Sequence, residues 1–230
     1  MNEILRKHLY YEEPGITIYN ADCRDILPHL EKVDLVLTDP PYGVMLGEVK
    51  NGRAIERQTQ KYSQFSDTPQ YIKDVVVPII SECINKFSRV IITPGQRNAF
   101  EYPNPDDIGG WFNPAGAGVG KWGFLCLHTI LYYGKDPRAG IGCMPSSVTG
   151  FSGGRSEIID HPCPKPIEFM RWMVKKGSLE NETILDPFMG SGTTLRAAKD
   201  LGRQAIGIEI EEKYCAIAVK RLQQEVFSFK

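Results

Sequence analysis

Short apolar runs with the composition of β-strands recur along this chain and alternate with stretches of helical pattern. The strand-like runs are Ile16 to Tyr19, Val33 to Thr38, Arg89 to Thr93, Leu125 to Tyr133, Thr183 to Asp186 and Gln204 to Glu209. The helical stretches between them are Tyr71 to Phe87, Ile167 to Lys176 and Thr194 to Leu201. This alternation predicts an α/β fold, with a mostly parallel sheet covered by helices on both faces.

Three further segments complete the predicted organisation. The segment from Glu211 onward repeats apolar residues at helical spacing, which predicts a helix packed on the sheet. Its stripe consists of Cys215, Val219, Leu222 and Val226. The segments Tyr102 to Lys121 and Met144 to Pro166 are interrupted by prolines and glycines, so we expect loops there.

Size and composition narrow the class of protein. The 230 residues suit one domain, and 42% hydrophobic with 24% charged residues is typical of a globular chain. No apolar run reaches about 20 residues and the polar start lacks a signal-peptide core, so we expect a cytoplasmic protein without a membrane partner. The six cysteines form no CxxC pair, which favours reduced thiols and no metal site. A net charge of -1 argues against a protein that coats nucleic acid, but it permits a locally basic cleft.

The stretch LVLTDPPYG carries an unusual strand end. An apolar run is followed by Asp39, Pro40, Pro41 and Tyr42. A carboxylate in such a place must be solvated or have a function, and two prolines hold the backbone in a nearly fixed shape. We therefore predict a rigid turn with a chemical role.

The stretch ETILDPFMGSGTTLRAAKDLGRQAIGIEI predicts a binding site for a nucleoside. One strand ends in Asp186, a turn with Gly190 and Gly192 follows, and the strand after the next helix ends in Glu209. Glycines let backbone amides approach a ligand, and an acid at about this spacing binds ribose hydroxyls in dinucleotide folds. Leu195 stands at the third glycine position of the dinucleotide fingerprint, and no lysine follows as in a phosphate-binding loop. The expected ligand carries an adenosine and needs no phosphate.

Together these motifs resemble those of the S-adenosylmethionine-dependent DNA amino-methyltransferases, the N6-adenine/N4-cytosine family. The order of TDPPYG before DPFMGSGTT is similar to that of the permuted, beta-type class. NADC at 20–23, HPCPKP at 161–166 and GIEIEEKYCAIAVKR at 207–221 are similar to further family motifs. Ala21 departs from the family's frequent glycine, and the resemblance leaves out most of 44–160.

The resemblance implies a fold and a division of the chain. The fold is a permuted, doubly wound, mostly parallel seven-stranded sheet of the Rossmann-like methyltransferase type. It forms one domain, 1–230, with a catalytic part at 1–43 and a cofactor-binding part at 161–230. Between them, 44–160 would hold a DNA-contacting loop and a target-recognition region mixed with sheet strands. The strands that end at Asp39 and Asp186 would be neighbours, so that both motifs face one cleft.

The resemblance also assigns the catalytic residues Asp39, Pro40, Pro41 and Tyr42. The Asp39 carboxylate and the Pro40 carbonyl would hold the two hydrogens of an exocyclic amine, with Pro41 keeping the turn rigid. Tyr42 would stack on a base swung out of double-stranded DNA. Aspartate rather than serine at position 39 favours N6 of adenine over N4 of cytosine.

For S-adenosylmethionine, the resemblance implies a contact set from several parts of the chain. Contacts to the methionine end are Asp186, Phe188, Gly190, Ser191, Gly192 and Thr193. Glu209 would bind the ribose, and Asp22 with Cys23 the adenine. Lys165 and Pro166 would close over the methionine carboxylate.

Predictions for DNA contacts fall on the middle of the chain. Those to the phosphate backbone are Lys50, Arg53, Arg57 and Lys61, although an exposed loop of mixed charge explains the same pattern. Base recognition is expected within 94–160, where the candidates are Gln96, Arg97, Trp111, Lys121, Arg138 and Arg155. Trp111 and Trp122 are equally compatible with packing roles. So small a recognition region suggests a homodimer.

Several alternatives stay open at this point. Cys163 offers a nucleophile for methylation of a cytosine ring carbon, but it lies inside the HPCPKP match. A nicotinamide oxidoreductase would use the glycine turn and Glu209, yet leaves the DPPY turn unexplained. A non-catalytic relative and an RNA or protein substrate are the remaining possibilities.

Overall fold

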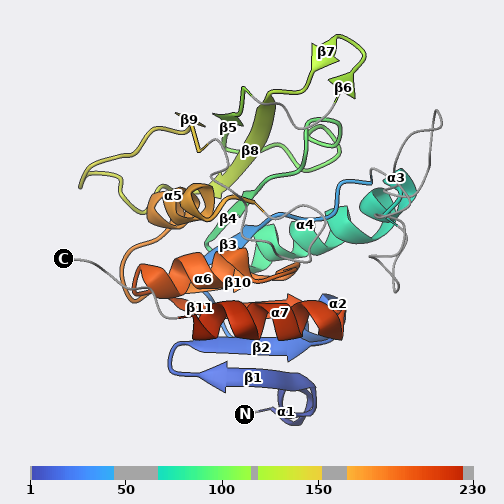
Figure 1. Ribbon diagram of the computed structural model, residues 1–230, viewed down its shortest axis with the longest axis vertical. Coiled ribbons are helices and arrows are strands. Elements are labelled where there is room, and N and C mark those ends of the chain that lie inside the picture. Colours follow the sequence, from blue (N-terminus) through green and yellow to red (C-terminus); the bar gives the residue numbers. More distant parts are fainter. Residues whose placement is uncertain (1, 44–66, 115–118, 152–164, 225–230) are drawn as a thin grey trace.

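A computed structural model describes residues 2–43, 67–114, 119–151 and 165–224 (Figure 1). Within these residues, no helix combines the length and the apolar character that crossing a membrane requires.

A single large sheet organises the described residues. Its strands are β1 (Leu9–Glu13), β2 (Ile16–Asn20), β3 (Leu35–Thr38), β4 (Arg89–Ile92), β5 (Asp107–Phe112), β8 (Leu127–Gly134), β9 (Val148–Thr149), β10 (Thr183–Asp186) and β11 (Gln204–Glu209). They lie in the order β1-β2-β11-β10-β3-β4-β8-β5-β9. A separate short hairpin is formed by β6 (Val119–Gly120) and β7 (Gly123–Phe124).

Parallel pairing brings five strand ends to one edge of the sheet. Strands β2, β11, β10, β3 and β4 are successive parallel neighbours, with Leu35 of β3 opposite Ile184 of β10. The prediction that the strands leading to Asp39 and Asp186 are neighbours in the sheet is therefore confirmed. Their carboxyl ends, with Thr38, Asp186 and Glu209, lie side by side at what we call the carboxyl edge.

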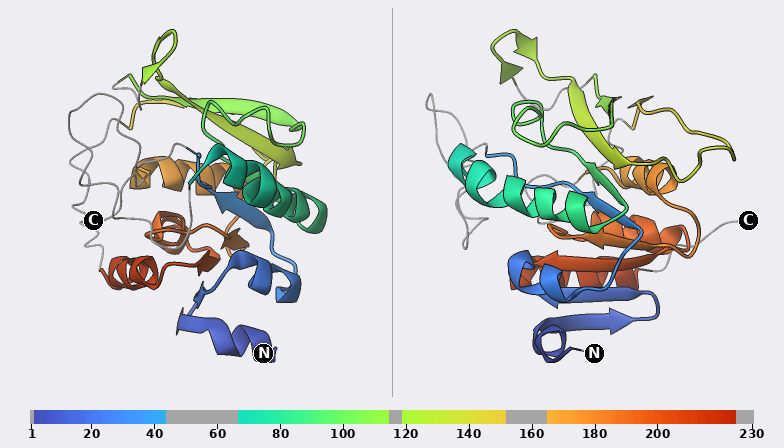
Figure 2. Two further views of the ribbon diagram at one scale, coloured as in Figure 1. Left: turned by 90° about the vertical axis from the view of Figure 1, so that its right-hand side faces the viewer. Right: turned by 180° about the vertical axis from the view of Figure 1, so that it is seen from behind.

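Helices cover both faces of the sheet, as the alternating pattern predicts (Figure 2). They are α1 (Glu3–His8), α2 (Cys23–Ile26), α3 (Pro69–Tyr71), α4 (Val77–Lys86), α5 (Ile167–Gly177), α6 (Thr193–Asp200) and α7 (Glu212–Gln223), with a 3-10 turn η1 (Leu27–His29) and a π turn η2 (Ile72–Val76). Helices α5, α6 and α7 bury one apolar core, with Phe169 and Leu195 at its centre. Helices α1, α2 and α4 bury the other, around Ile80 and Val36. The doubly wound α/β class is thus confirmed.

The helix predicted from Tyr71 to Phe87 is present, with a local irregularity. The π turn η2 lies near its start and ends two residues before Pro78, which is in the first turn of α4. Proline has no amide hydrogen and its ring clashes with the carbonyl four residues earlier. A widened turn relieves that clash while the rod continues.

The sheet has nine strands among the described residues rather than the predicted seven. The N-terminal strand β1 adds one edge and the short β9 the other. Strand β5 lies inside a segment predicted as loop because of its glycines. At Gly109 and Gly110 a Cβ would overlap Ser146 and Leu127, so these glycines mark close packing within a strand rather than a turn.

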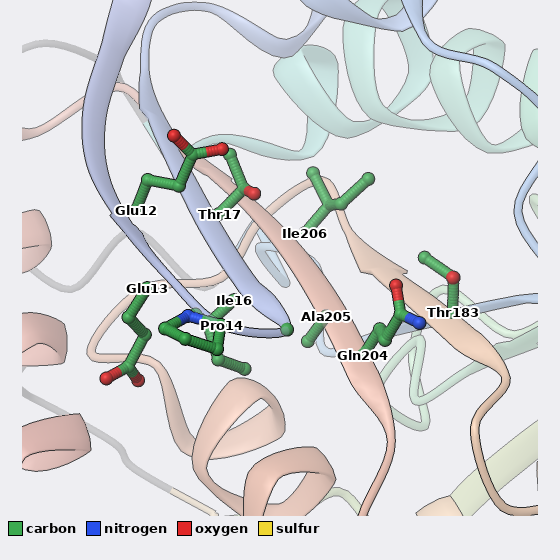
Figure 3. A pocket seen from close by; sticks show the side chains of 10 residues that line it. Glu12, Glu13, Pro14, Ile16, Thr17, Thr183, Gln204, Ala205 and Ile206 are labelled. Atoms are coloured by element: carbon green, nitrogen blue, oxygen red, sulfur yellow. The ribbon is translucent and has the colours of Figure 1, made fainter.

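A hollow of about 560 Å³ lies away from the carboxyl edge (Figure 3). It is lined by Ile16, Thr183 and Gln204, which begin β2, β10 and β11, and by Glu12 and Glu13 of β1. The hollow is therefore at the amino-terminal edge of the sheet. It contains none of the residues to which the sequence assigns chemistry.

Candidate active site

The DPPY turn follows β3 at the carboxyl edge, and its acid is held by hydrogen bonds. The Thr93 hydroxyl donates to Asp39 Oδ1 over 2.5 Å, and the Tyr42 hydroxyl donates to the same oxygen. Thr93 follows β4, the neighbouring strand, and its amide donates to the Thr38 carbonyl. The end of one strand thus fixes the side-chain orientation of the acid at the end of the next.

The rest of the turn is anchored through its backbone. Asn98 Nδ2 donates to the Tyr42 carbonyl over 2.7 Å, and the Gly43 amide donates to Asp67 Oδ1 over 2.6 Å. The Tyr42 ring lies against Gly95, where an added Cβ would come within 3.2 Å of the ring. Asn98 and Gly95 escaped the sequence analysis, although they belong to a Pro-Gly segment directly after a predicted strand.

Lys165 makes the closest charged contact of this turn. Its Nζ donates to both Asp39 oxygens over 2.7 Å and to the Tyr42 hydroxyl over 2.6 Å. Its side chain is 7% exposed, and that of Asp39 is 26% exposed. The resemblance places Lys165 over the methionine carboxylate of the cofactor. In this structure the ammonium lies on the Asp39 carboxylate instead.

The glycine turn between β10 and α6 has the conformation that its sequence demands. Gly190 and Gly192 have φ of 51° and 76°, the left-handed region that favours glycine. A Cβ on Gly192 would lie 2.6 Å from that of Ala218 in α7, so close packing adds a second reason for glycine there. Gly192 also caps the start of α6.

Asp186 joins the glycine turn to the DPPY turn. The Thr38 hydroxyl donates to Asp186 Oδ1 over 2.6 Å, and the Phe188 amide donates to it over 3.1 Å. Asp186 is buried, and burial raises the pKa of its carboxyl to about 6. Because Asp39 directly follows Thr38, the two motifs meet across one hydrogen bond.

Glu209 faces the glycine turn from the end of β11. The Gly190 amide donates to its Oε2 over 2.9 Å and the Glu211 amide to its Oε1 over 2.8 Å. Burial raises the pKa of Glu209 to about 7. A buried carboxylate beside a glycine turn is the arrangement that ribose hydroxyls, as hydrogen-bond donors, would satisfy.

Arg221 of α7 stabilises the glycine turn, and the sequence analysis missed it. Its Nη1 donates to the Ser191 carbonyl over 3.1 Å and to the Thr193 hydroxyl. The side chain is buried. The sequence contained one signal for it: Arg221 directly precedes Leu222, a member of the apolar stripe predicted for this helix.

The predicted adenine contacts lie on the other side of Glu209. Asp22 caps α2, accepting from the Arg24 amide over 2.9 Å, and forms an ion pair with the Arg24 side chain over 2.6 Å. Cys23 is buried, and burial raises the pKa of its thiol. The Ala21 amide donates to the Glu209 carbonyl, which ties this segment to β11.

Two aromatic residues lie next to the site. The sequence left base recognition and packing open for Trp111 and did not single out His128. Trp111 is buried, stacks on His128 at 4.5 Å and on Phe169 at 4.6 Å, and therefore packs in the core rather than reading bases. His128 Nε2 is buried without a hydrogen-bond partner among the described residues. Burial, together with the positive charge of Lys165, lowers the pKa of His128 to about 4.

Some predicted residues lie outside the described parts of the chain. These are Lys50, Arg53, Arg57, Lys61, Arg155, Cys163 and Val226. In the described parts, no group of three or more His, Cys, Asp or Glu side chains could hold a metal ion.

The sheet is Rossmann-like, with a glycine turn after β10 and an acid at the end of β11. A rigid acidic turn follows β3, the other neighbour of β10. Together these features define a class, the nucleoside-cofactor methyltransferases. Comparisons narrow this class. The sequence model of a family described as DNA methylase matches residues 145–220. Among curated relatives, the Type II methyltransferase M2.LlaDCHI of Lactococcus lactis subsp. cremoris is 25% identical over 96% of this chain and 94% of its own length. M2.DpnII of Streptococcus pneumoniae is also 25% identical, over 96% and 95%.

Solved structures agree on the fold. The M1.HpyAVI-SAM complex superimposes with a TM-score of 0.64 at 22% identity, covering 91% of this chain and 100% of that one. The PvuII DNA methyltransferase (cytosine-N4-specific) gives a TM-score of 0.62 at 17% identity, covering 93% and 88%. The chain is thus similar to the N6/N4 family of DNA methyltransferases, over residues 145–220 to the family model and over nearly its whole length to relatives named as Type II methyltransferases.

Proposed function

We propose that this protein transfers the methyl group of S-adenosylmethionine to the N6 amine of an adenine flipped out of double-stranded DNA. The observation that carries the proposal is the Thr38–Asp186 hydrogen bond, at 2.6 Å. It joins the ends of two neighbouring strands, one leading into the DPPY turn and the other into the glycine turn. A methyl donor and an acceptor amine bound at these turns would be adjacent.

The cofactor half of the site is formed by Glu209, the glycine turn and the segment at Asp22 and Cys23. Glu209 accepts from the ribose hydroxyls, and the left-handed glycines let the backbone approach the methionine end. Asp22 and Cys23 border the adenine. When bound, S-adenosylmethionine supplies an electrophilic methyl group on a sulfonium.

The catalytic half has to make a delocalised amine nucleophilic. The Asp39 carboxylate and the Pro40 carbonyl accept its two hydrogens and hold the nitrogen toward the methyl group. Thr93 and Tyr42 hold one Asp39 oxygen in place, so little reorganisation is needed during the reaction. The Tyr42 ring, supported on Gly95, provides a face on which the flipped base stacks.

Adenine is favoured over cytosine because position 39 is aspartate. N4 of cytosine is the second candidate, since the acceptor geometry accommodates either amine and one structural neighbour is named as cytosine-N4-specific.

One reaction tests the proposal. The protein is incubated with labelled S-adenosylmethionine and, separately, duplex DNA, single-stranded DNA and RNA of mixed sequence, and the nucleosides are analysed by mass spectrometry. We expect N6-methyladenine in duplex DNA, and none with Asp39→Asn. Label in N4-methylcytosine would overturn the choice of base, and label in RNA alone the choice of substrate. Binding of NAD without S-adenosylmethionine would favour an oxidoreductase.

A further inference from the structure

Lys165 occupies the hydrogen-bonding position that the proposed substrate needs. A target amine would donate to the Asp39 carboxylate, and the Lys165 ammonium already donates to both of its oxygens over 2.7 Å. Both groups are nitrogen donors that compete for one acceptor. The lysine and the target amine would therefore compete for the Asp39 carboxylate in this conformation.

The two Asp39 oxygens differ in how they are held. Oδ1 also accepts from Thr93 and Tyr42, whereas Lys165 is the hydrogen-bond partner recorded for Oδ2 among the described residues. If the ammonium moved away, Thr93 and Tyr42 would keep the carboxylate oriented. Oδ2 would then be a positioned acceptor without a donor, as an incoming amine requires.

The backbone position of Lys165 permits such a movement. Lys165 directly precedes Pro166, which caps α5 with its φ fixed at -56°. Helix α5 packs beside α6, whose cap is Gly192 of the glycine turn. Both helices begin at the carboxyl edge, so the flexible four-carbon side chain of Lys165 is anchored at the edge that also carries the glycine turn.

We infer that Lys165 is a positioning residue that exchanges partners. It holds Asp39 in the ligand-free protein, and it moves its ammonium to the carboxylate of the methyl donor when that donor binds, which exposes Oδ2 to the target amine. This inference rests on the proposed function. The exchange keeps the lysine protonated and makes no covalent bond. Its consequence is that the donor enters before the base.

The exchange is tested by a double-mutant cycle that measures binding rather than turnover. The ligand is S-adenosylhomocysteine, which has the amino-acid carboxylate but no sulfonium charge that would itself respond to Asp39. Its dissociation constant is measured by isothermal titration calorimetry for the wild type, Asp39→Asn, Lys165→Met and the double variant. Asp39→Asn should bind roughly tenfold more tightly, because the ammonium no longer has to leave a carboxylate.

The other two arms complete the cycle. Lys165→Met should bind roughly tenfold more weakly, and adding Asp39→Asn to it should change the dissociation constant by less than about twofold. A second ligand, 5′-methylthioadenosine, lacks the amino-acid end. All four proteins should bind it within about twofold of one another.

A matched control lies in the last turn of α5, the helix that follows Lys165. Lys176 of α5 is also largely buried and forms an ion pair with Asp136 over 2.5 Å. Lys176→Met and Asp136→Asn remove a comparable ion pair away from the site, so neither should change the affinity for S-adenosylhomocysteine. If Lys165→Met fails to fold, the Asp39→Asn arm alone decides, because the inference requires it to bind more tightly.

The outcomes separate this inference from the proposed function. If Asp39→Asn fails to tighten binding, or its effect persists in the Lys165→Met background, the exchange is refuted while the methyltransferase proposal stands. If wild-type protein binds neither adenosine ligand, the proposed function fails and the exchange with it.

Discussion

Glu209 offers a quantitative test of how the proposed nucleoside site is held. Its side chain lies at the end of β11, is 9% exposed, and accepts hydrogen bonds from the Gly190 and Glu211 amides. Burial raises its pKa from 4.5 to about 7. The folded protein therefore binds a proton more tightly at Glu209 than the unfolded chain does.

The sign of the effect on stability follows from this difference. A raised pKa in the folded state gives stability that is fully present below the unfolded value and is lost as pH rises through the folded value. The free energy of unfolding should thus fall between about pH 4.5 and pH 7. The difference between 4.5 and 7 corresponds to about 3 kcal/mol for Glu209. Asp186 contributes in the same direction, because burial raises its pKa from 3.8 to about 6.

Glu209→Gln isolates the glutamate's contribution. Urea unfolding is followed by circular dichroism at about pH 5 and about pH 8 for the wild type and the variant. The variant is expected to be less stable at the lower pH, because its amide group cannot accept from both backbone amides. Between the two pH values it should lose about 3 kcal/mol less than the wild type.

A control and a ligand measurement sharpen the test. Glu212→Gln changes an exposed side chain and should keep the wild-type pH profile. The affinity for S-adenosylhomocysteine should fall as pH drops below about 7, because ribose hydroxyls donate to the ionised carboxylate. An identical pH dependence of unfolding in Glu209→Gln and the wild type would refute the reasoning.

Three further substitutions test other contacts. Thr38→Val keeps the shape of the side chain but removes its hydrogen bond to Asp186. The free energy of unfolding, measured in urea, should fall by about 1–3 kcal/mol. An unchanged urea midpoint would contradict the role given to that bond. Arg221→Met removes the donor that stabilises the glycine turn and should weaken binding of S-adenosylhomocysteine at least about tenfold by calorimetry, whereas Arg171→Met in α5 should not. Trp122→Ala removes a fully exposed ring between β6 and β7. It should weaken duplex DNA binding roughly tenfold in a fluorescence anisotropy titration and leave the affinity for S-adenosylhomocysteine unchanged. If the variant and the wild type bind DNA equally well, Trp122 does not contact DNA.

The sequence predicted those parts of the fold in which local pattern and tertiary environment agree. Strands β10 and β11 were predicted with their observed ends because short, mainly apolar runs stop at acids. Strand β5 was missed because Gly109 and Gly110 read locally as turn residues. Glycine is needed at these two positions because Ser146 and Leu127, which are distant in sequence, approach the strand closely.

The candidate site shows the same division. The motifs predicted which strand ends carry acids, and the pairing of β3 with β10 follows from the family order. The side-chain partners of those acids did not follow. Lys165 was predicted at the cofactor but lies on Asp39, and Thr93 and Arg221 were not singled out, because the packing of separate elements brings these side chains to the site.

The pairing of β2 with β11 has a consequence for how the protein is made. Strand β2 lies near the start of the chain, and its inner neighbour β11 is the last strand of the sheet. Asn20 completes the join by donating to the Glu209 carbonyl. During translation, β2 keeps one side unpaired until β11 has emerged, because Asn20 and Glu209 are 189 positions apart. The proposed nucleoside site therefore assembles only after β11 is made, so a product truncated before β11 would lack it.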